Sequence, residues 1–186
     1  MRTLVVYFSR TGHTRNVAHA IARELDADVE EIADATQRRG LLGYLRSAYE
    51  AERERSARIA PPVSSAGDYD LVVIGTPVWD ANVSSPVRAY LRATRGTLPA
   101  KVAFFCTLGG RGSRRVLDKM TVAAGVRPVA ELALTERDLA HPSWERAVRD
   151  FAERLAAGST DRGAAASATA GAHGASFTAA HGRHGA

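Results

Sequence analysis

The 186-residue sequence lacks features that several protein classes require. Its single cysteine, Cys106, excludes an intramolecular disulfide and a multi-cysteine metal site. No apolar run approaches the roughly 20 residues that span a bilayer, and the apolar stretch near the N-terminus is shorter than that of a signal peptide. The sequence therefore predicts a cytoplasmic protein without a transmembrane segment.

Acidic side chains are in the minority, since 25 Lys and Arg side chains accompany 20 Asp and Glu side chains and give a net charge of +5. A basic balance can indicate nucleic-acid binding. Most arginines, however, are spread along helical patterns and alternate with glutamates, which is typical of solvated helix faces. We therefore expect no nucleic-acid partner.

Four signatures of other α/β proteins are absent as well. The sequence contains neither GxxxxGK[ST] nor GxGxxG, which excludes a P-loop and a dinucleotide fingerprint. It contains no GxSxG, the nucleophile motif of α/β-hydrolases. A phospho-receiver domain would need acidic residues where this chain has Ser9-Arg10 and Gly75-Thr76.

Short apolar runs alternate with amphipathic helical patterns along most of the chain. This alternation predicts an α/β fold with a doubly wound, five-stranded parallel sheet. The most apolar run, 71–75, is expected at the centre of the sheet, and the more polar 29–32 at an edge. The other expected strands are 4–8, 101–106 and 129–134, and the expected helices begin at Thr14, at about Leu41, after Ser85, at Arg114 and after Ser143.

Composition changes sharply after residue 157. Residues 158–186 are mostly Ala, Gly, Ser and Thr, with one large apolar side chain, so they bury too little surface to offset the entropy of ordering. We expect a folded domain over 1–157 and a disordered tail over 158–186. The irregular spacing of the tail histidines argues against a metal site there.

Three polar or glycine-rich loops follow the first, third and fourth expected strands. The first loop, residues 9–14, offers three hydroxyls and one glycine where a buried strand leads into a helix, a place that suits a phosphate. The second loop, residues 76–83, contains Trp79, whose flat surface can stack on a ring system. The third loop, residues 107–113, has three glycines that allow close backbone approach. Because parallel strands end at the same edge of a sheet, these loops are expected on one rim.

Together, the segments Ser9–Thr14, Gly75–Trp79 and Cys106–Gly110 resemble those of short proteins of the flavodoxin family, over about residues 1–157. The resemblance implies the strand order 2-1-3-4-5 and non-covalently bound FMN on the rim. The first loop would hold the phosphate, and the other two would contact the flavin ring. The implied cofactor-binding residues are Ser9, Arg10, Thr11, Gly12, His13, Thr14, Thr76, Pro77, Val78, Trp79, Asp80, Asn82, Thr107, Leu108, Gly109, Gly110 and Gly112.

Two features depart from the family pattern. Flavodoxins that shuttle electrons are typically acidic, whereas this chain is basic. Many of them also place a second aromatic residue in the third loop, where this chain has Leu108 and Arg111. One face of the flavin would then be open to a substrate, a quinone or another subunit, and Arg111 is a candidate to stabilise reduced flavin.

These observations leave the function open between three classes. The resemblance implies a redox protein that transfers electrons through bound FMN, and a reductase of NAD(P)H or quinones is the first alternative. A flavin-binding sensor or interaction module without turnover is the second. The expected partner is a redox protein or a small acceptor such as a quinone, and a homodimer is left open. No catalytic residue or metal ligand is predicted, since Asp80 reads as a solvated carboxylate and Cys106 as a packed thiol.

Overall fold

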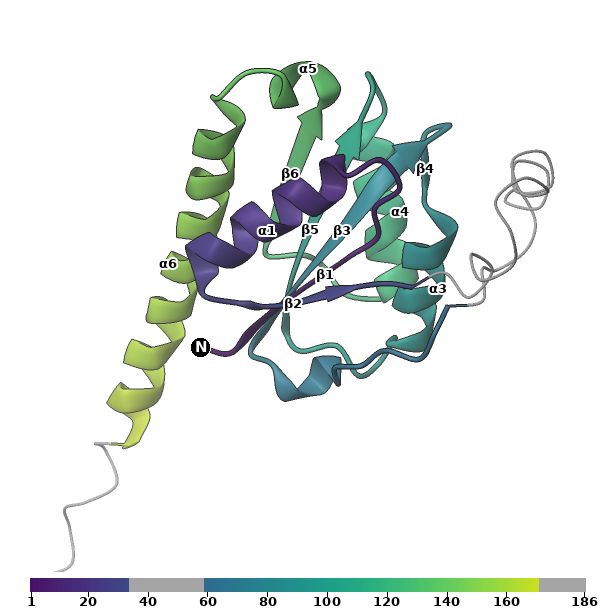
Figure 1. Ribbon diagram of the computed structural model, residues 1–186. Coiled ribbons are helices and arrows are strands. Elements are labelled where there is room, and N and C mark those ends of the chain that lie inside the picture. Colours follow the sequence, from purple (N-terminus) through teal and green to yellow (C-terminus); the bar gives the residue numbers. More distant parts are fainter. Residues whose placement is uncertain (34–58, 171–186) are drawn as a thin grey trace, which may run out of the picture.

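The computed structural model describes residues 1–33 and 59–170, with side chains through residue 157. Strands and helices alternate along the described chain, as the sequence predicts (Figure 1). The predicted helix over residues 41–58 lies outside the described residues. The elements are β1 (Thr3–Tyr7), α1 (His13–Leu25), β2 (Asp28–Glu31), η2 (Ala66–Asp68), β3 (Leu71–Trp79), β4 (Asn82–Val83), α3 (Ser85–Ala93), β5 (Lys101–Leu108), α4 (Ser113–Ala124), β6 (Ala130–Thr135), α5 (Glu136–Leu139) and α6 (Trp144–Ala170).

The sheet has the order β2-β1-β3-β5-β6, and these five strands are parallel. Counted among the parallel strands alone, this is the predicted order 2-1-3-4-5. The apolar strand β3 lies at the centre, and the polar strand β2 lies at one edge, both as predicted. The chain places β2 on one side of β1 and then β3 on the other side, so the order in which strands are added across the sheet reverses between β1 and β3. Ligands of doubly wound folds bind outside the carboxyl ends of the strands at such a switch point.

Helices cover both faces of the sheet (Figure 1). On one face, α1 and α6 bury alternate strand residues such as Val5 and Val73. On the other face, α3 and α4 bury the intervening residues, such as Val6 and Ile74. Because successive side chains of a strand point to opposite faces, strands buried on both sides are apolar at nearly every position.

Register places the three predicted loops at one level. Tyr7 of β1 pairs with Gly75 of β3, and Gly75 pairs with Phe105 of β5. The chain after each of these residues therefore leaves the sheet side by side with the others. Gly75 is required here, because a Cβ at this position would lie 2.0 Å from Cζ of Phe105.

The structure corrects the predicted bounds of the second and third loops. Strand β3 continues through Trp79 and pairs antiparallel with β4, so residues 76–83 form a β-hairpin and not an irregular loop. Its two turn residues, Asp80 and Ala81, have φ values of 49° and 53°. Positive φ at both positions is the geometry of a type I′ turn, whose twist matches that of the strands. Likewise β5 extends to Leu108, so the third loop proper begins at Gly109.

Two further differences lie near the C-terminus. The short helix α5 was not predicted, and its start is fixed by a capping box in which Thr135 and Asp138 bond each other's backbone N–H. The predicted domain boundary at residue 157 falls within α6, which continues to Ala170. The disorder of the 158–186 tail stays a prediction, and residues 171–186 lie outside the described part of the chain.

Candidate functional site

The first loop turns tightly between β1 and α1. The backbone N–H of Gly12 donates to Oγ of Ser9 at 3.2 Å, which closes the loop on itself. Gly12 then caps α1 with a φ of 97°, a conformation that glycine adopts at little cost. The first N–H groups of α1, beginning at His13, have no partner within the helix and point towards the rim. The 13-residue helix thus presents amides and a positive dipole end to this loop.

The hairpin of the second loop is anchored by a buried threonine. Thr76 has no exposed surface, and its hydroxyl accepts from the N–H of Ser84 at 3.1 Å. The same hydroxyl lies 2.9 Å from the carbonyl of Pro77 and 3.1 Å from the hydroxyl of Ser84. These contacts hold the Thr76 side chain within the hairpin. Val78, Trp79 and Asn82, by contrast, are half-exposed and can contact a ligand.

Trp79 is half-buried at the end of β3, where it contacts Phe8, the residue after β1, and Arg10 of the first loop. The Phe8 ring meets it edge-on, with 6.0 Å between centroids and 87° between planes. The guanidinium of Arg10 lies over the Trp79 ring, 5.5 Å from its centroid. A cation over an indole face is attracted by the ring quadrupole. Trp79 is therefore held in a defined orientation at the rim, with a positive charge beside it.

The third loop joins β5 to α4 and repeats the design of the first. Gly112 caps α4 with a φ of 104°, and its carbonyl accepts from the N–H of Val116 at 3.2 Å. Gly109, Gly110 and Arg111 are exposed. A second helix N-terminus therefore opens onto the same rim as that of α1.

Contacts connect the three loops in pairs. The hydroxyls of Thr14 and Thr107 lie 2.8 Å apart and join the first loop to the end of β5. Arg10 and Trp79 join the first loop to the second. A Cβ built on Gly112 would lie 3.3 Å from that of Ala81, so the second and third loops are in close approach. The structure therefore brings together the three segments that were singled out in the sequence.

One residue at the rim has no signal in the sequence. Lys119, two turns into α4, donates to Oδ1 of Asn82 and lies 3.4 Å from the carbonyl of Ala81. It thereby ties the tip of the hairpin to α4. The pKa of Lys119 is lowered, first by burial and then by the positive charges of Arg115 and Arg88. Lys119 can make these contacts because residues 76–83 form a hairpin. The sequence predicted an irregular loop there, so it did not indicate a role for Lys119.

Neither Cys106 nor a metal-binding cluster adds to this site among the described residues. Cys106 is fully buried, and burial raises the pKa of its thiol to about 12, so it is the packed thiol that the sequence predicted. In the part of the chain that the structure describes, no three His, Cys, Asp or Glu side chains gather into a possible metal site. No helix among those residues is long and apolar enough to cross a membrane.

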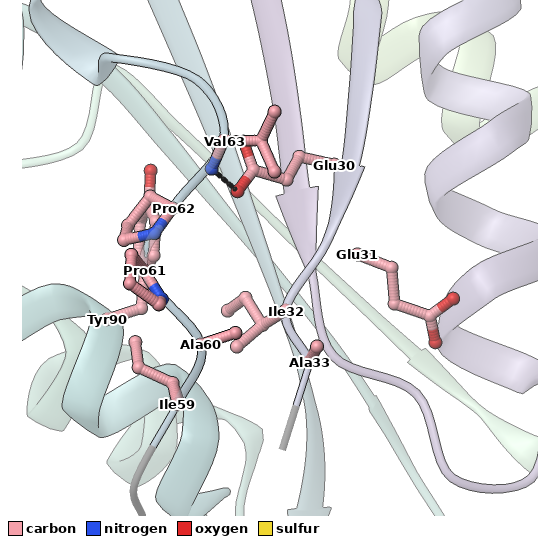
Figure 2. Close-up of a pocket in the computed structure, with 10 residues that line it drawn as sticks. All are labelled: Glu30, Glu31, Ile32, Ala33, Ile59, Ala60, Pro61, Pro62, Val63 and Tyr90. Atoms are coloured by element: carbon pink, nitrogen blue, oxygen red, sulfur yellow. Dashed lines mark hydrogen bonds between the residues drawn. The ribbon is translucent and has the colours of Figure 1, made fainter. Parts of the chain in front are cut away.

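A small hollow lies away from the rim (Figure 2). Its volume is about 60 Å³, far below the several hundred Å³ of a typical ligand pocket. It is lined by residues 30–33, by residues 59–63 and by Tyr90 of α3. Glu30 accepts from the N–H of Val63 at 2.8 Å, so this carboxylate holds two chain segments together. The hollow beside β2 is therefore too small to hold a nucleotide.

Comparisons with known proteins agree with this geometry. The flavodoxin family matches residues 2–135. A flavoprotein from Lactobacillus acidophilus, solved in complex with FMN, is 22% identical over 71% of this chain and 92% of its own, with a TM-score of 0.59. A WrbA-like flavodoxin from Agrobacterium tumefaciens is 15% identical over 83% and 96%, with a TM-score of 0.52. An NADH:FMN oxidoreductase in its apo form is 17% identical over 83% and 88%, also with a TM-score of 0.52. The match over most of the chain and the shared fold show that this protein belongs to the flavodoxin family.

Proposed function

We propose that this chain is a redox protein that transfers electrons through non-covalently bound FMN, the cofactor of its family. The observation that carries the proposal is the closure of the rim, where the hydroxyls of Thr14 and Thr107 meet and Arg10 of the first loop lies over Trp79. The donor set fits the cofactor, because helix N-termini with neighbouring hydroxyls suit a phosphate dianion and an indole suits a flat ring.

The first loop would hold the phosphate. Ser9, Thr11 and Thr14 supply hydroxyls, and the loop from Arg10 to Thr14 supplies backbone amides at the start of α1. Since the Ser9 hydroxyl already accepts from Gly12, we assign it to shaping the loop as much as to binding. The amides carry partial positive charge, so they neutralise the phosphate without a lysine.

The second and third loops would hold the flavin ring. Trp79 offers its indole for stacking, and the backbone from Thr76 to Asn82 can meet the polar ring edge. The backbone from Thr107 to Gly112 would approach from the other side of the rim. When bound, FMN supplies a ring that accepts and releases electrons, while the protein residues orient it and set the local charge. The guanidinium of Arg10 contacts the Trp79 ring. Its charge would stabilise negative charge on a flavin ring stacked there.

A reductase of NAD(P)H or quinones is the second candidate, and one observation favours it. Between Gly109 and Gly112 the exposed third loop has no aromatic side chain, so nothing in that loop would stack on the outer face of the ring. An uncovered ring face admits a planar acceptor. A sensor or module without turnover fits the same fold but gains no support from this feature.

Anaerobic titration of the FMN-loaded protein separates the candidates. Bleaching of the flavin by NADH or NADPH, followed by reoxidation with a benzoquinone over many turnovers, supports the reductase. Reduction by dithionite but not by nicotinamides, in two resolved one-electron steps, supports the carrier. Reduction by dithionite alone, with neither a resolved one-electron step nor turnover with nicotinamide and quinone, supports the module. A purified chain that is colourless and refuses added FMN contradicts the proposal as a whole.

A further inference from the structure

Positive charge is not evenly distributed along the chain. Residues 81–130 hold nine Lys and Arg side chains but a single acidic one, Asp118. The other residues carry 16 basic and 19 acidic side chains, so the whole positive excess belongs to this one stretch. The alternation of arginines with glutamates seen elsewhere in the sequence does not extend to residues 81–130.

The fold gathers this stretch on one layer. Residues 81–130 comprise β4, α3, β5 and α4, and the two helices cover the same face of the sheet (Figure 1). Helices α1 and α6 on the opposite face carry mixed charges up to residue 157, among them the pair Arg149 and Glu24 at 3.9 Å. We call the five cations of this layer that lie near the rim the basic face: Arg88, Arg111, Arg114, Arg115 and Lys119.

The basic face adjoins the proposed flavin site. Helices α3 and α4 run away from the rim, so Arg88 and Arg115 lie in their first turns. Lys119 contacts the hairpin that carries Trp79. The pKa of Lys119 is lowered first by burial and then by the charges of Arg115 and Arg88, against the opposing charge of Asp80, so three cations and one carboxylate share this neighbourhood. Asp118, the one acidic residue of this stretch, pairs with Arg114 at 3.3 Å and so offsets the charge of one member of the basic face.

An apolar side chain accompanies these charges. Val122 is 75% exposed on α4, one helical stripe with Arg115 and Lys119 at i, i+4 and i+7. The only aromatic of α3 and α4 is Tyr90, which is buried, so the face has no platform on which bases would stack. A basic face without an aromatic platform fits an acidic protein surface better than single-stranded nucleic acid.

We propose that the basic face docks the acidic surface of a redox partner protein beside the flavin. The inference rests on the proposed function and adds the charge and position of the partner. When bound, FMN would supply the electron, and the basic face would hold the partner's electron acceptor beside the ring, so that a one-electron oxidation of the flavin would accompany a one-electron reduction of the partner. Charge complementarity of this kind raises the association rate and is screened by salt.

Stopped-flow oxidation tests the proposal with two protein probes of opposite charge. Dithionite-reduced, FMN-loaded protein is mixed with an acidic blue-copper protein or with a basic cytochrome c, at low and high salt. The test variant is Arg88→Glu with Arg115→Glu. The matched control is Arg23→Glu with Arg146→Glu, which changes the net charge equally at exposed positions of α1 and α6. None of these four residues belongs to the predicted cofactor contacts.

We expect the wild-type rate with the copper protein to fall about tenfold or more between low and high salt. The Arg88/Arg115 variant should lose about tenfold at low salt with the copper protein and gain rate with cytochrome c. The control pair should change either rate by less than about threefold. Equal losses in both variants would overturn the proposal, because net charge alone would then explain them. A wild-type protein that prefers cytochrome c would overturn it too.

Two further outcomes separate this inference from its premises. If the chain bound no FMN, the proposed function would fail. Docking would then be measured by titrating the apo chain with oxidised copper protein, for the wild type and for the same variants. The same ranking there would support the basic face on its own, and no binding would refute it. Tighter binding of a double-stranded oligonucleotide, lost in the Arg88/Arg115 variant, would reassign the face to nucleic acid.

Discussion

The side-chain oxygens of Thr14 and Thr107 lie 2.8 Å apart, although 93 residues separate them in the sequence. Both side chains are buried, with 1% and 5% exposure. Thr14 lies in the first turn of α1, and Thr107 lies near the end of β5, two strands away from β1. This hydrogen bond therefore crosses the switch point and closes the rim on which the proposed flavin site depends.

A double-mutant cycle measures that bond. Thr14→Val or Thr107→Val alone leaves one buried hydroxyl without its partner, at a cost of about 1–3 kcal/mol in unfolding free energy. The double variant removes both hydroxyls with the shape kept, so it should cost clearly less than the two single losses combined. Urea melts of the apo chain give the three values, and additive losses would show that the two hydroxyls do not interact.

The same variants distinguish the two threonines as ligands. Thr14 belongs to the proposed phosphate loop, whereas Thr107 supports it from β5. We expect Thr14→Val to weaken FMN binding more than Thr107→Val, by about tenfold for one lost hydrogen bond to a charged group. Flavin fluorescence titrations measure both constants, and the reverse ranking would contradict the assignment of Thr14.

Gly75→Ala tests the close packing at the base of the rim. The added methyl group would lie 2.0 to 2.6 Å from three atoms of the Phe105 ring, on strands that cannot separate without loss of pairing. We expect a loss of about 1–3 kcal/mol or more in unfolding free energy. Thermal and urea melts measure it.

Removal of the obstructing ring provides the control for that substitution. Phe105→Leu alone should destabilise the chain by leaving a cavity in the core. Added to Gly75→Ala, it should recover part of the stability that the methyl group removed. A double variant less stable than the summed single losses predict would show that the cost of Gly75→Ala has another cause.

Much of this architecture could be predicted from the sequence, because apolar runs and helix signals are local. The strands and most helices needed only nearby residues, whereas the order of the strands came from the resemblance to flavodoxins. The hairpin was missed because its turn, Asp80-Ala81, lacks the glycine that usually marks positive φ. The rim contacts of Lys119 and Ala81 join distant residues, and no local pattern encodes such pairs.

Lys119→Met tests the tie between α4 and the hairpin. The substitution keeps the aliphatic length but removes the donor to Asn82 and Ala81. We expect faster amide exchange in the hairpin and FMN binding weakened several-fold, with less than about 1 kcal/mol lost in global stability. Arg127→Met, at an exposed position past the far end of α4, is the control. Unchanged hairpin exchange in Lys119→Met would show that the tie does not order the hairpin.

The capping box of α5 predicts a pH dependence of stability. Hydrogen bonds from the backbone N–H and the hydroxyl of Thr135 hold the pKa of Asp138 below its ordinary value. A carboxyl with a lowered folded pKa stabilises the fold above its unfolded pKa, near 4, and loses that contribution as pH falls through the folded value. Asp138→Asn should therefore be less stable than wild type at pH 7, with the difference shrinking towards pH 3.

Urea melts at both pH values make that comparison. Asp118→Asn, which removes an exposed pair with Arg114, should show only a small difference at either pH. A constant gap between Asp138→Asn and wild type across this range would contradict the role of ionised Asp138.

Titration of the apo protein with FMN, followed by flavin fluorescence, tests the central claim most directly. We predict quenching at one FMN per chain with a dissociation constant of micromolar or below, weakened about tenfold or more in Trp79→Ala and less in Trp79→Phe, which retains an aromatic ring. Absence of quenching at tens of micromolar FMN, or equal affinity of wild type and Trp79→Ala, would contradict a flavin site at this rim.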